Sequence, residues 1–120
     1  MLFLQYPPCS TCKRAKNWLD EKGISYTSRH IKEENPSYEE LTLWLEASGL
    51  PVKKFFNTSG LQYKSLGLKD KLPAMNQEEQ LRLLATDGML VKRPILVTDD
   101  GKVLVGFQEK LWAERLLSNR

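Results

Sequence analysis

The pair of cysteines near the start of the chain is the feature that most limits its fold. Cys9 and Cys12 are the only two cysteines among 120 residues; an apolar run, residues 1–4, precedes them and a helical pattern follows. A cysteine at such a strand-to-helix junction lies at the helix N-terminus, where free backbone N–H groups and the helix dipole stabilise a thiolate. The sequence therefore predicts a strand–helix unit that carries reactive thiols at its turn.

The first third of the chain predicts a βαβ unit. Residues 2–6 indicate a short buried strand, residues 10–22 a helix that stops at Gly23, and residues 24–31 a second strand. Because one helix joins these strands, we expect them to be parallel. The predicted inward face of the helix consists of Ala15, Trp18, Leu19 and Lys22.

The middle of the chain, about residues 37–90, predicts a block of helices. Ser37 with Glu40 forms a capping box at the start of one helix, and Asn76 with Glu79 has the same spacing at another. Further short helices are predicted at residues 52–56 and 61–68, separated by a loop at residues 57–60. We predict that these helices end at Gly49 and Pro51 and at Asp87-Gly88.

The last third predicts a β-hairpin and a helix. Residues 94–98 and 102–105 indicate two strands joined by a turn at residues 99–101, and residues 108–117 an amphipathic helix. Its predicted inward residues are Leu111, Trp112, Arg115 and Leu116. The order β-α-β, helical block, β-β-α, with cysteines after the first strand, predicts one α/β domain over residues 1–120: a thioredoxin-like fold with a mixed four-stranded sheet and a helical insertion.

Composition limits the class of protein. A hydrophobic fraction of 41% and a charged fraction of 28% are typical of a soluble globular domain. The net charge of +3 allows acidic partners but does not indicate direct nucleic-acid binding. No run is long enough for a membrane span, and because Met1 opens the first strand we expect no leader peptide. We therefore expect a cytoplasmic protein in a reducing compartment.

Three uses of the two cysteines are open. A zinc site needs four ligands, so His30, carboxylates or a second chain would have to complete it. A static disulfide is untypical of the cytosol. In redox chemistry, positions i and i+3 of a helix share a face, which brings the sulfurs within disulfide reach. The more exposed Cys9 would then attack, and Cys12 would resolve the intermediate.

Neighbouring residues bear on that chemistry. Lys13 and Arg14 are either solvated charges or cations that lower the pKa of Cys9. Ser10 and Thr11 either cap the helix or offer hydroxyls to a bound anion.

Two segments carry a resemblance to a known family. Residues 6–12, Tyr-Pro-Pro-Cys-Ser-Thr-Cys, and residues 92–98, Lys-Arg-Pro-Ile-Leu-Val-Thr, resemble the ArsC/Spx family of thioredoxin-fold proteins, and the likeness extends over nearly the whole chain. The family includes glutaredoxin-dependent arsenate reductases and the redox-sensing transcription factor Spx. The resemblance implies a cis peptide bond before Pro94 and places Arg93 opposite Cys9, where a guanidinium would stabilise a thiolate or hold an oxyanion.

The resemblance also implies differences from the arsenate reductases. Lys13 stands where they have the arginine that follows the catalytic cysteine, Asn57 stands at a second arginine and Gly106 at a third. Because a dianion needs charge-assisted donors to replace its water, these changes weaken the expected arsenate site. Those reductases also use a single cysteine, whereas Cys12 offers a resolving thiol, as in Spx.

These features predict an arsenate-reductase-like thiol–disulfide oxidoreductase without a metal or organic cofactor. Cys9, Cys12 and Arg93 are its predicted catalytic residues, and Ser10, Thr11, Lys13 and Pro94 its predicted anion-binding residues. Electrons would come from a thiol donor such as glutathione with glutaredoxin, or thioredoxin. The alternative is an Spx-like regulator that docks on the C-terminal domain of the RNA polymerase α-subunit; because the chain ends at Arg120, without the longer tail of Spx, we expect no proteolytic control of that kind.

Overall fold

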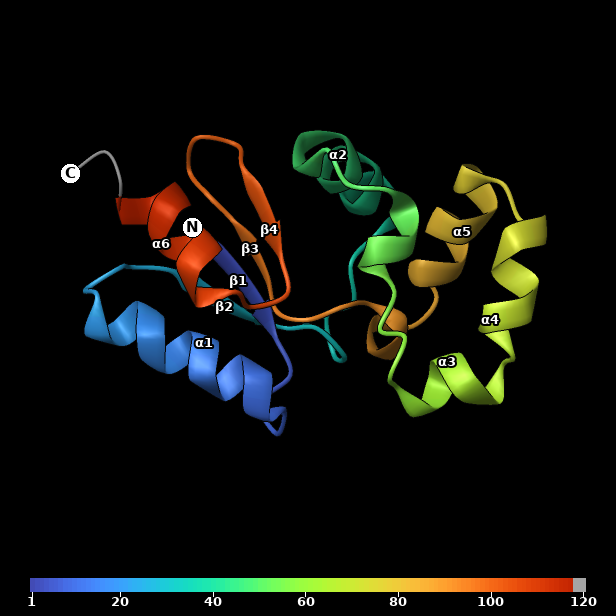
Figure 1. The fold of residues 1–120 in the computed structure, drawn as a ribbon, viewed down its shortest axis with the longest axis horizontal. Helices are drawn as coiled ribbons and strands as arrows, with labels where there is room; N and C mark the ends of the chain where they lie inside the picture. The colour runs from blue at the N-terminus through green and yellow to red at the C-terminus, as the bar shows by residue number, and fades with distance from the viewer. Residues whose placement is uncertain (118–120) are drawn as a thin grey trace.

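A mixed four-stranded sheet forms the centre of the fold. The computed structural model describes residues 1–117 of the chain. The strands are β1 (Leu2–Gln5), β2 (Thr27–His30), β3 (Ile95–Val97) and β4 (Val103–Val105), in the order β2-β1-β3-β4. β1 runs parallel to β2 and antiparallel to β3, and β3 runs antiparallel to β4, which confirms the predicted thioredoxin-like arrangement (Figure 1).

The helices fall into two groups. α1 (Ser10–Glu21) and α6 (Glu109–Leu117) lie together against the sheet (Figure 1). The segment between β2 and β3 supplies all the others, and α3, α4 and α5 gather away from α1 and α6. These elements are α2 (Tyr38–Ser48), α3 (Leu61–Ser65), α4 (Leu68–Lys71), α5 (Gln77–Leu84), and the 3-10 helices η1 (Val52–Phe55), η2 (Leu72–Ala74) and η3 (Gly88–Leu90).

Alternation along the strands divides the core into two clusters. Successive strand residues point to opposite faces of a sheet, so Phe3 packs in one cluster and its neighbour Leu4 in the other. The cluster under α1 and α6 contains Trp112, which is fully buried and meets Trp18 with ring centroids 6.2 Å apart. The Trp112 indole also donates a 3.1 Å hydrogen bond to the carbonyl of Gly106, which joins α6 to the end of β4.

The second cluster joins the sheet to the helical segment. Leucines of α2 and α5 pack with aromatic residues of η1 and α3, and an isolated bridge pairs Phe56 with Val91. Both predicted capping boxes are present: Ser37 Oγ accepts from the Glu40 N–H at 3.1 Å, and Asn76 Oδ1 accepts from the Glu79 N–H at 2.8 Å. These caps satisfy N–H groups that helix starts leave without partners.

Some predicted boundaries differ from the structure. The second strand pairs with β1 only from Thr27, because Ile24 lies in the turn after α1 and packs into the core instead. The helix predicted over residues 61–68 is divided at Gly67, whose positive φ of 64° ends the helical path. Lys22 and Arg115, predicted on inward helix faces, are exposed, since their charges favour water. Every helix within residues 1–117 is too short or too polar to cross a membrane.

Candidate active site at the cysteine loop

Cys9 lies at the N-cap of α1, as predicted. Its φ and ψ are −74° and 125°, and no side-chain oxygen caps the helix there. The loop is fixed by a 2.9 Å hydrogen bond from the Cys9 N–H to the Tyr6 carbonyl, and the Cys9 carbonyl accepts from the Lys13 N–H at 3.0 Å. The half-buried sulfur therefore occupies the place where a serine or aspartate oxygen would normally accept from the first helical turn.

The surroundings of Cys9 favour its thiolate. Burial alone raises the pKa of Cys9, but hydrogen bonds from the backbone N–H and the thiol of Cys12, from the Arg93 guanidinium and from the Thr11 N–H outweigh it. The net effect is a pKa of Cys9 below its ordinary value of 9.0. Since the thiolate is the nucleophilic form, the lowered pKa makes Cys9 more reactive than an ordinary cysteine.

Cys12 has the opposite character. It is fully buried, and its sulfur accepts a 3.5 Å hydrogen bond from the Tyr6 N–H. Burial, together with the negative charge on Cys9, raises the pKa of Cys12 to about 12. No disulfide joins the two sulfurs in the structure. One activated and one protonated thiol on the same helical turn is the arrangement that an attacking and a resolving cysteine require.

Arg93 reaches the thiols from the far end of the chain. The Arg93–Pro94 bond is cis, as the resemblance implied, and the half-buried guanidinium hydrogen-bonds the Cys9 sulfur. Its central carbon lies 5.0 Å from the centre of the Tyr6 ring. Arg93 Nε and Nη1 are buried and have no hydrogen-bond partner in the part of the chain that the structure describes. Two charged N–H groups therefore lie beside the thiols without an acceptor from these residues.

The other predicted anion-binding residues are less involved. Ser10 and Lys13 are exposed on the first turn of α1, and the Thr11 hydroxyl accepts a 3.4 Å hydrogen bond from Arg14. Thr11 acts on Cys9 through its backbone N–H. Pro94 is buried, and its carbonyl accepts from the Gly106 N–H at 2.8 Å. These residues shape the site, while Arg93 is the cation whose side chain reaches the sulfur.

A cavity of about 390 Å³ adjoins Arg93. Its wall combines the insertion with the loop after β2: Lys32, Asn57, Ser59, Gly60, Leu61, Gln62, Asp87, Met89 and Arg93. The lining has two cations and one carboxylate. Leu61 is 86% exposed and gives the rim an apolar side chain.

Two positions that the resemblance relates to anion-binding arginines are uncharged in the structure. Asn57 does line the cavity beside Arg93, and its N–H donates to the Leu90 carbonyl at 2.8 Å. Gly106 lies against Pro94 with φ +74°, and a Cβ there would come within 3.3 Å of the Lys92 side chain. The cavity therefore has fewer cations than a site for a dianion would be expected to use.

Two contributors to the site were not predicted. Tyr6 contacts both Cys12 and Arg93, since its N–H donates to the Cys12 sulfur and its ring faces the guanidinium. Its place at the end of a strand, directly before the cysteine loop, is a signal that could have identified it. Leu61 had no such signal, because its exposure depends on how α3 packs.

No group of three or more histidine, cysteine, aspartate or glutamate side chains within residues 1–117 is arranged to hold a metal ion. His30, the remaining candidate ligand, uses Nδ1 to accept from the N–H groups of Lys32 and Glu33, at 3.3 and 3.2 Å. The ring packs edge-on against Tyr6.

Sequence comparison relates the chain to one family. The profile of the ArsC family matches residues 4–115. The chain is 54% identical over 114 residues to the uncharacterised protein YusI of Bacillus subtilis, covering 95% of this chain and 96% of that protein. It is 30% identical over 104 residues to the global transcriptional regulator Spx of Staphylococcus epidermidis, covering 86% of this chain and 76% of that protein.

Solved structures agree with the sequence comparison. A Bacteroides fragilis protein described as ArsC family related has a TM-score of 0.91 and 60% identity, covering 94% of each chain. A protein from Streptococcus mutans described as a possible arsenate reductase has a TM-score of 0.82 and 50% identity, covering 89% of this chain and 90% of that one.

Proposed function

The chain belongs to the ArsC family, and on that premise we propose that it is a thiol–disulfide oxidoreductase with Cys9 as its attacking thiolate. The observation that carries the proposal is the contrast between the two thiols. The pKa of Cys9 is lowered, while that of Cys12 is raised to about 12. The contrast supports a separate role for each sulfur, with Cys9 the more readily ionised of the two.

The reaction proceeds by two exchanges at sulfur. The Cys9 thiolate attacks one sulfur of a substrate disulfide, which breaks that bond, forms a mixed disulfide and releases the first substrate thiolate. Cys12 then attacks the Cys9 sulfur, and its proton passes to the second substrate thiol as it departs. The substrate has gained two electrons and one proton from the protein, the released thiolate takes a second proton from water, and the protein holds a Cys9–Cys12 disulfide. A thiol donor such as glutathione or thioredoxin restores both thiols.

Arg93 stabilises the negative charge that develops on sulfur. Its guanidinium hydrogen-bonds Cys9, and Arg93 also lines the cavity in which a carboxylate of a thiol substrate would bind. The exposed Leu61 supports an organic substrate, because an apolar rim offers nothing to a small inorganic dianion. With Asn57 and Gly106 in place of arginines, arsenate is the weaker substrate.

A coupled assay tests this function. The protein is supplied with NADPH and either the glutaredoxin or the thioredoxin system, and offered arsenate or a low-molecular-weight disulfide. We expect turnover of the disulfide that is lost in Cys9→Ser, and little turnover of arsenate. Efficient arsenate reduction that requires Cys9 would show that the substrate is an oxyanion and not a disulfide. If neither substrate is turned over and Cys9 does not react with iodoacetamide at neutral pH, the proposed enzymatic function is refuted.

Similarity to Spx favours a second candidate, a redox-sensing regulator. In that role the Cys9–Cys12 disulfide would be the signal, and the partner would be the C-terminal domain of the RNA polymerase α-subunit. A pull-down with that domain, using the oxidised protein and the Cys9→Ser variant, separates the candidates. Binding that follows the redox state, without turnover, would favour the regulator. We propose a cytoplasmic location for either role, since both need a reducing compartment.

A further inference from the structure

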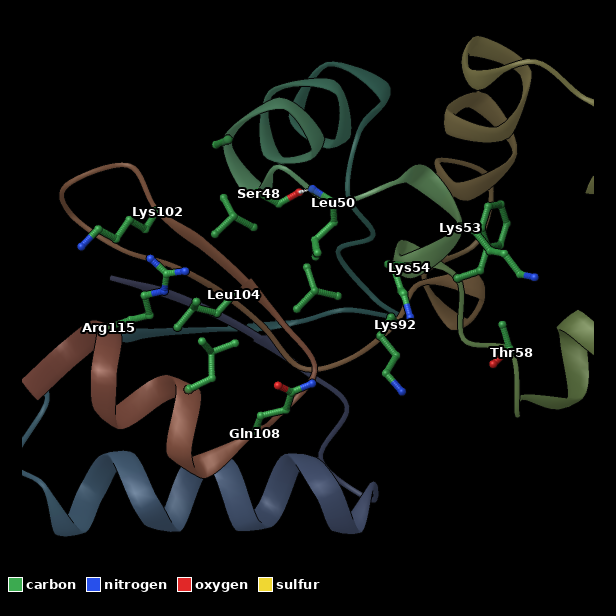
Figure 2. Close-up of a pocket in the computed structure, with 15 residues that line it drawn as sticks. Ser48, Leu50, Lys53, Lys54, Thr58, Lys92, Lys102, Leu104, Gln108 and Arg115 are labelled. Atoms are coloured by element: carbon green, nitrogen blue, oxygen red, sulfur yellow. Dashed lines mark hydrogen bonds between the residues drawn. The ribbon is translucent and has the colours of Figure 1, made fainter.

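A second and larger hollow lies between α2, β4 and α6. Its volume is about 790 Å³, and Cys9 is not among the residues that line it. Five of the lining residues are basic and none is acidic (Figure 2). The lining consists of Ala47, Ser48, Leu50, Lys53, Lys54, Phe56, Thr58, Lys92, Lys102, Val103, Leu104, Val105, Gln108, Leu111 and Arg115. We call this hollow the basic groove.

The charges of the basic groove form two separate groups. In Figure 2, Lys102 and Arg115 lie at one end, and Lys53, Lys54 and Lys92 lie at the other. The middle is apolar: Leu50 and Leu104 lie between the two groups. A ligand that fits must therefore present negative charge at two places and apolar surface between them.

The cations are available to a partner. Lys53, Lys54, Lys92 and Arg115 are exposed, and none of them forms an ion pair with another residue in the range 1–117. Lys102 has one ionic neighbour, Asp100, at 3.5 Å, and both side chains are largely in water. Such a pair contributes little and exchanges readily for another carboxylate.

The backbone that carries Leu50 is ordered before any ligand arrives. Leu50 is 38% exposed, yet its backbone N–H donates a 3.1 Å hydrogen bond to Ser48 Oγ, drawn as a dashed line in Figure 2. The Ser48 hydroxyl in turn donates to the Leu45 carbonyl at 2.8 Å. Gly49 takes the left-handed conformation that ends α2 and directs Leu50 outward. Because the backbone at Leu50 is already ordered, less entropy is lost on binding.

From these features we propose that the basic groove docks an acidic segment of a partner protein, one with carboxylates at both ends and aliphatic side chains at its centre. The carboxylates meet the two groups of cations, and the aliphatic centre covers the exposed side chain of Leu50. This surface is distinct from the thiol chemistry. The two sites adjoin through the chain, because Lys92 lines the groove and Arg93 contacts Cys9.

The groove fits a polypeptide better than a nucleic acid. Single strands bind through aromatic rings on which bases stack, but the one aromatic lining residue, Phe56, is only 2% exposed. The aliphatic middle would also lie against phosphates, where it contributes nothing. An extended peptide alternates its side chains and can satisfy both the charged ends and the apolar centre.

Fluorescence anisotropy tests the proposal with defined probes. The main probe is a fluorescein-labelled peptide with acidic residues at both ends and a leucine-rich centre. The comparison probes are an all-glutamate peptide and a single-stranded oligothymidine, each of the same charge. We expect the mixed peptide to bind tightest, and Lys53→Glu with Lys54→Glu to weaken it about tenfold. Leu50→Asn should weaken it about fivefold.

Matched controls decide whether the effect belongs to the groove. Lys69→Glu with Lys71→Glu makes the same change of charge on α4, and Leu43→Asn removes an exposed leucine of α2 that does not line the groove. Both should leave binding unchanged, as should Cys9→Ser, so failure of the thiol function would not affect this result. Equal losses in the controls, no binding of the mixed peptide, or equal binding of oligothymidine would overturn the proposal. So would a monomer–dimer equilibrium that Lys53→Glu with Lys54→Glu abolishes, because the occupant would then be a second copy.

Discussion

The sheet half of the molecule and its helical insertion differ in how they are built and in what they contribute. The sheet with α1 and α6 carries Cys9, Cys12 and Arg93, and large aromatic residues such as Trp112 fill its core. The α-helices of the insertion are short, with four to eleven residues, and the insertion contributes the opposite wall of the cavity, at residues 57–62. We infer that the regular half fixes the chemistry and the insertion selects what reaches it.

The largest effect should come from breaking the core of the sheet half. Trp112→Ala removes a fully buried ring and leaves the Gly106 carbonyl without its indole donor. We expect the free energy of unfolding to fall by about 4 kcal/mol, measured by urea denaturation followed by circular dichroism. Leu84→Ala, in the core of the insertion, should cost about 3 kcal/mol. A smaller loss from Trp112→Ala than from Leu84→Ala would mean that the core of the insertion contributes more to stability than the core of the sheet half.

The next effect tests how firmly the two halves are joined. A Cβ at Gly88 would lie 1.8 Å from the Ile31 carbonyl oxygen, so Gly88→Ala must push η3 away from the loop after β2. We expect a loss of about 3 kcal/mol. Gly23→Ala is the control, since a Cβ at that position would have no atom within 4 Å and only the φ of +67° opposes the change. That control should cost about 1 kcal/mol. Equal losses would mean that the halves are not closely packed there.

A smaller effect concerns the charge at the thiol. Arg93→Met removes a hydrogen bond that lowers the pKa of Cys9, so the pKa should rise and less thiolate should be present at pH 7. We expect alkylation by iodoacetamide in a Cys12→Ser background to slow about tenfold at pH 7, with the pH midpoint moved upward. Arg14→Met, an equal change of charge on α1, should leave the midpoint nearly unchanged. An unmoved midpoint in Arg93→Met would remove Arg93 from the mechanism.

The smallest effect should separate recognition from chemistry. Leu61→Ser removes the exposed apolar side chain at the cavity rim, and KM for a disulfide substrate should rise about threefold. The pH midpoint of Cys9 alkylation should not change, because Leu61 makes no contribution to the pKa of Cys9. Leu66→Ser is the matched control, since Leu66 is 40% exposed and does not line the cavity. If kcat rather than KM fell, the insertion would share in the chemistry.

Much of the sheet half could be predicted because its signals are local. The cysteines follow a strand and open a helix, and the N-cap position of Cys9 follows from that order alone. The two capping boxes were equally local, since each needs only the residues at its cap and third helical positions. The start of β2 has no local signal. Pairing with β1 begins at Thr27, and the partner strand sets that register.

The rest depends on residues far apart in sequence. Arg93 and Cys9 are joined by the fold, and the resemblance to a family, not the periodicity, brought them together. The basic groove is less predictable still, because its cations come from η1, the turn before β4, α6 and the segment before β3. A net charge of +3 gives no sign that five cations line one hollow.

The loop at residues 57–60 sets a condition for redesign. A Cβ at Gly60 would lie 2.6 Å from Asn57 Nδ2, and the Gly60 N–H already donates to the Asn57 carbonyl at 3.1 Å. The two residues therefore behave as one tight unit, and any side chain larger than that of glycine at position 60 would displace the Asn57 amide that lines the cavity. An engineer who wishes to graft an oxyanion receptor onto this scaffold would have to transplant the whole tetrapeptide rather than exchange a single side chain.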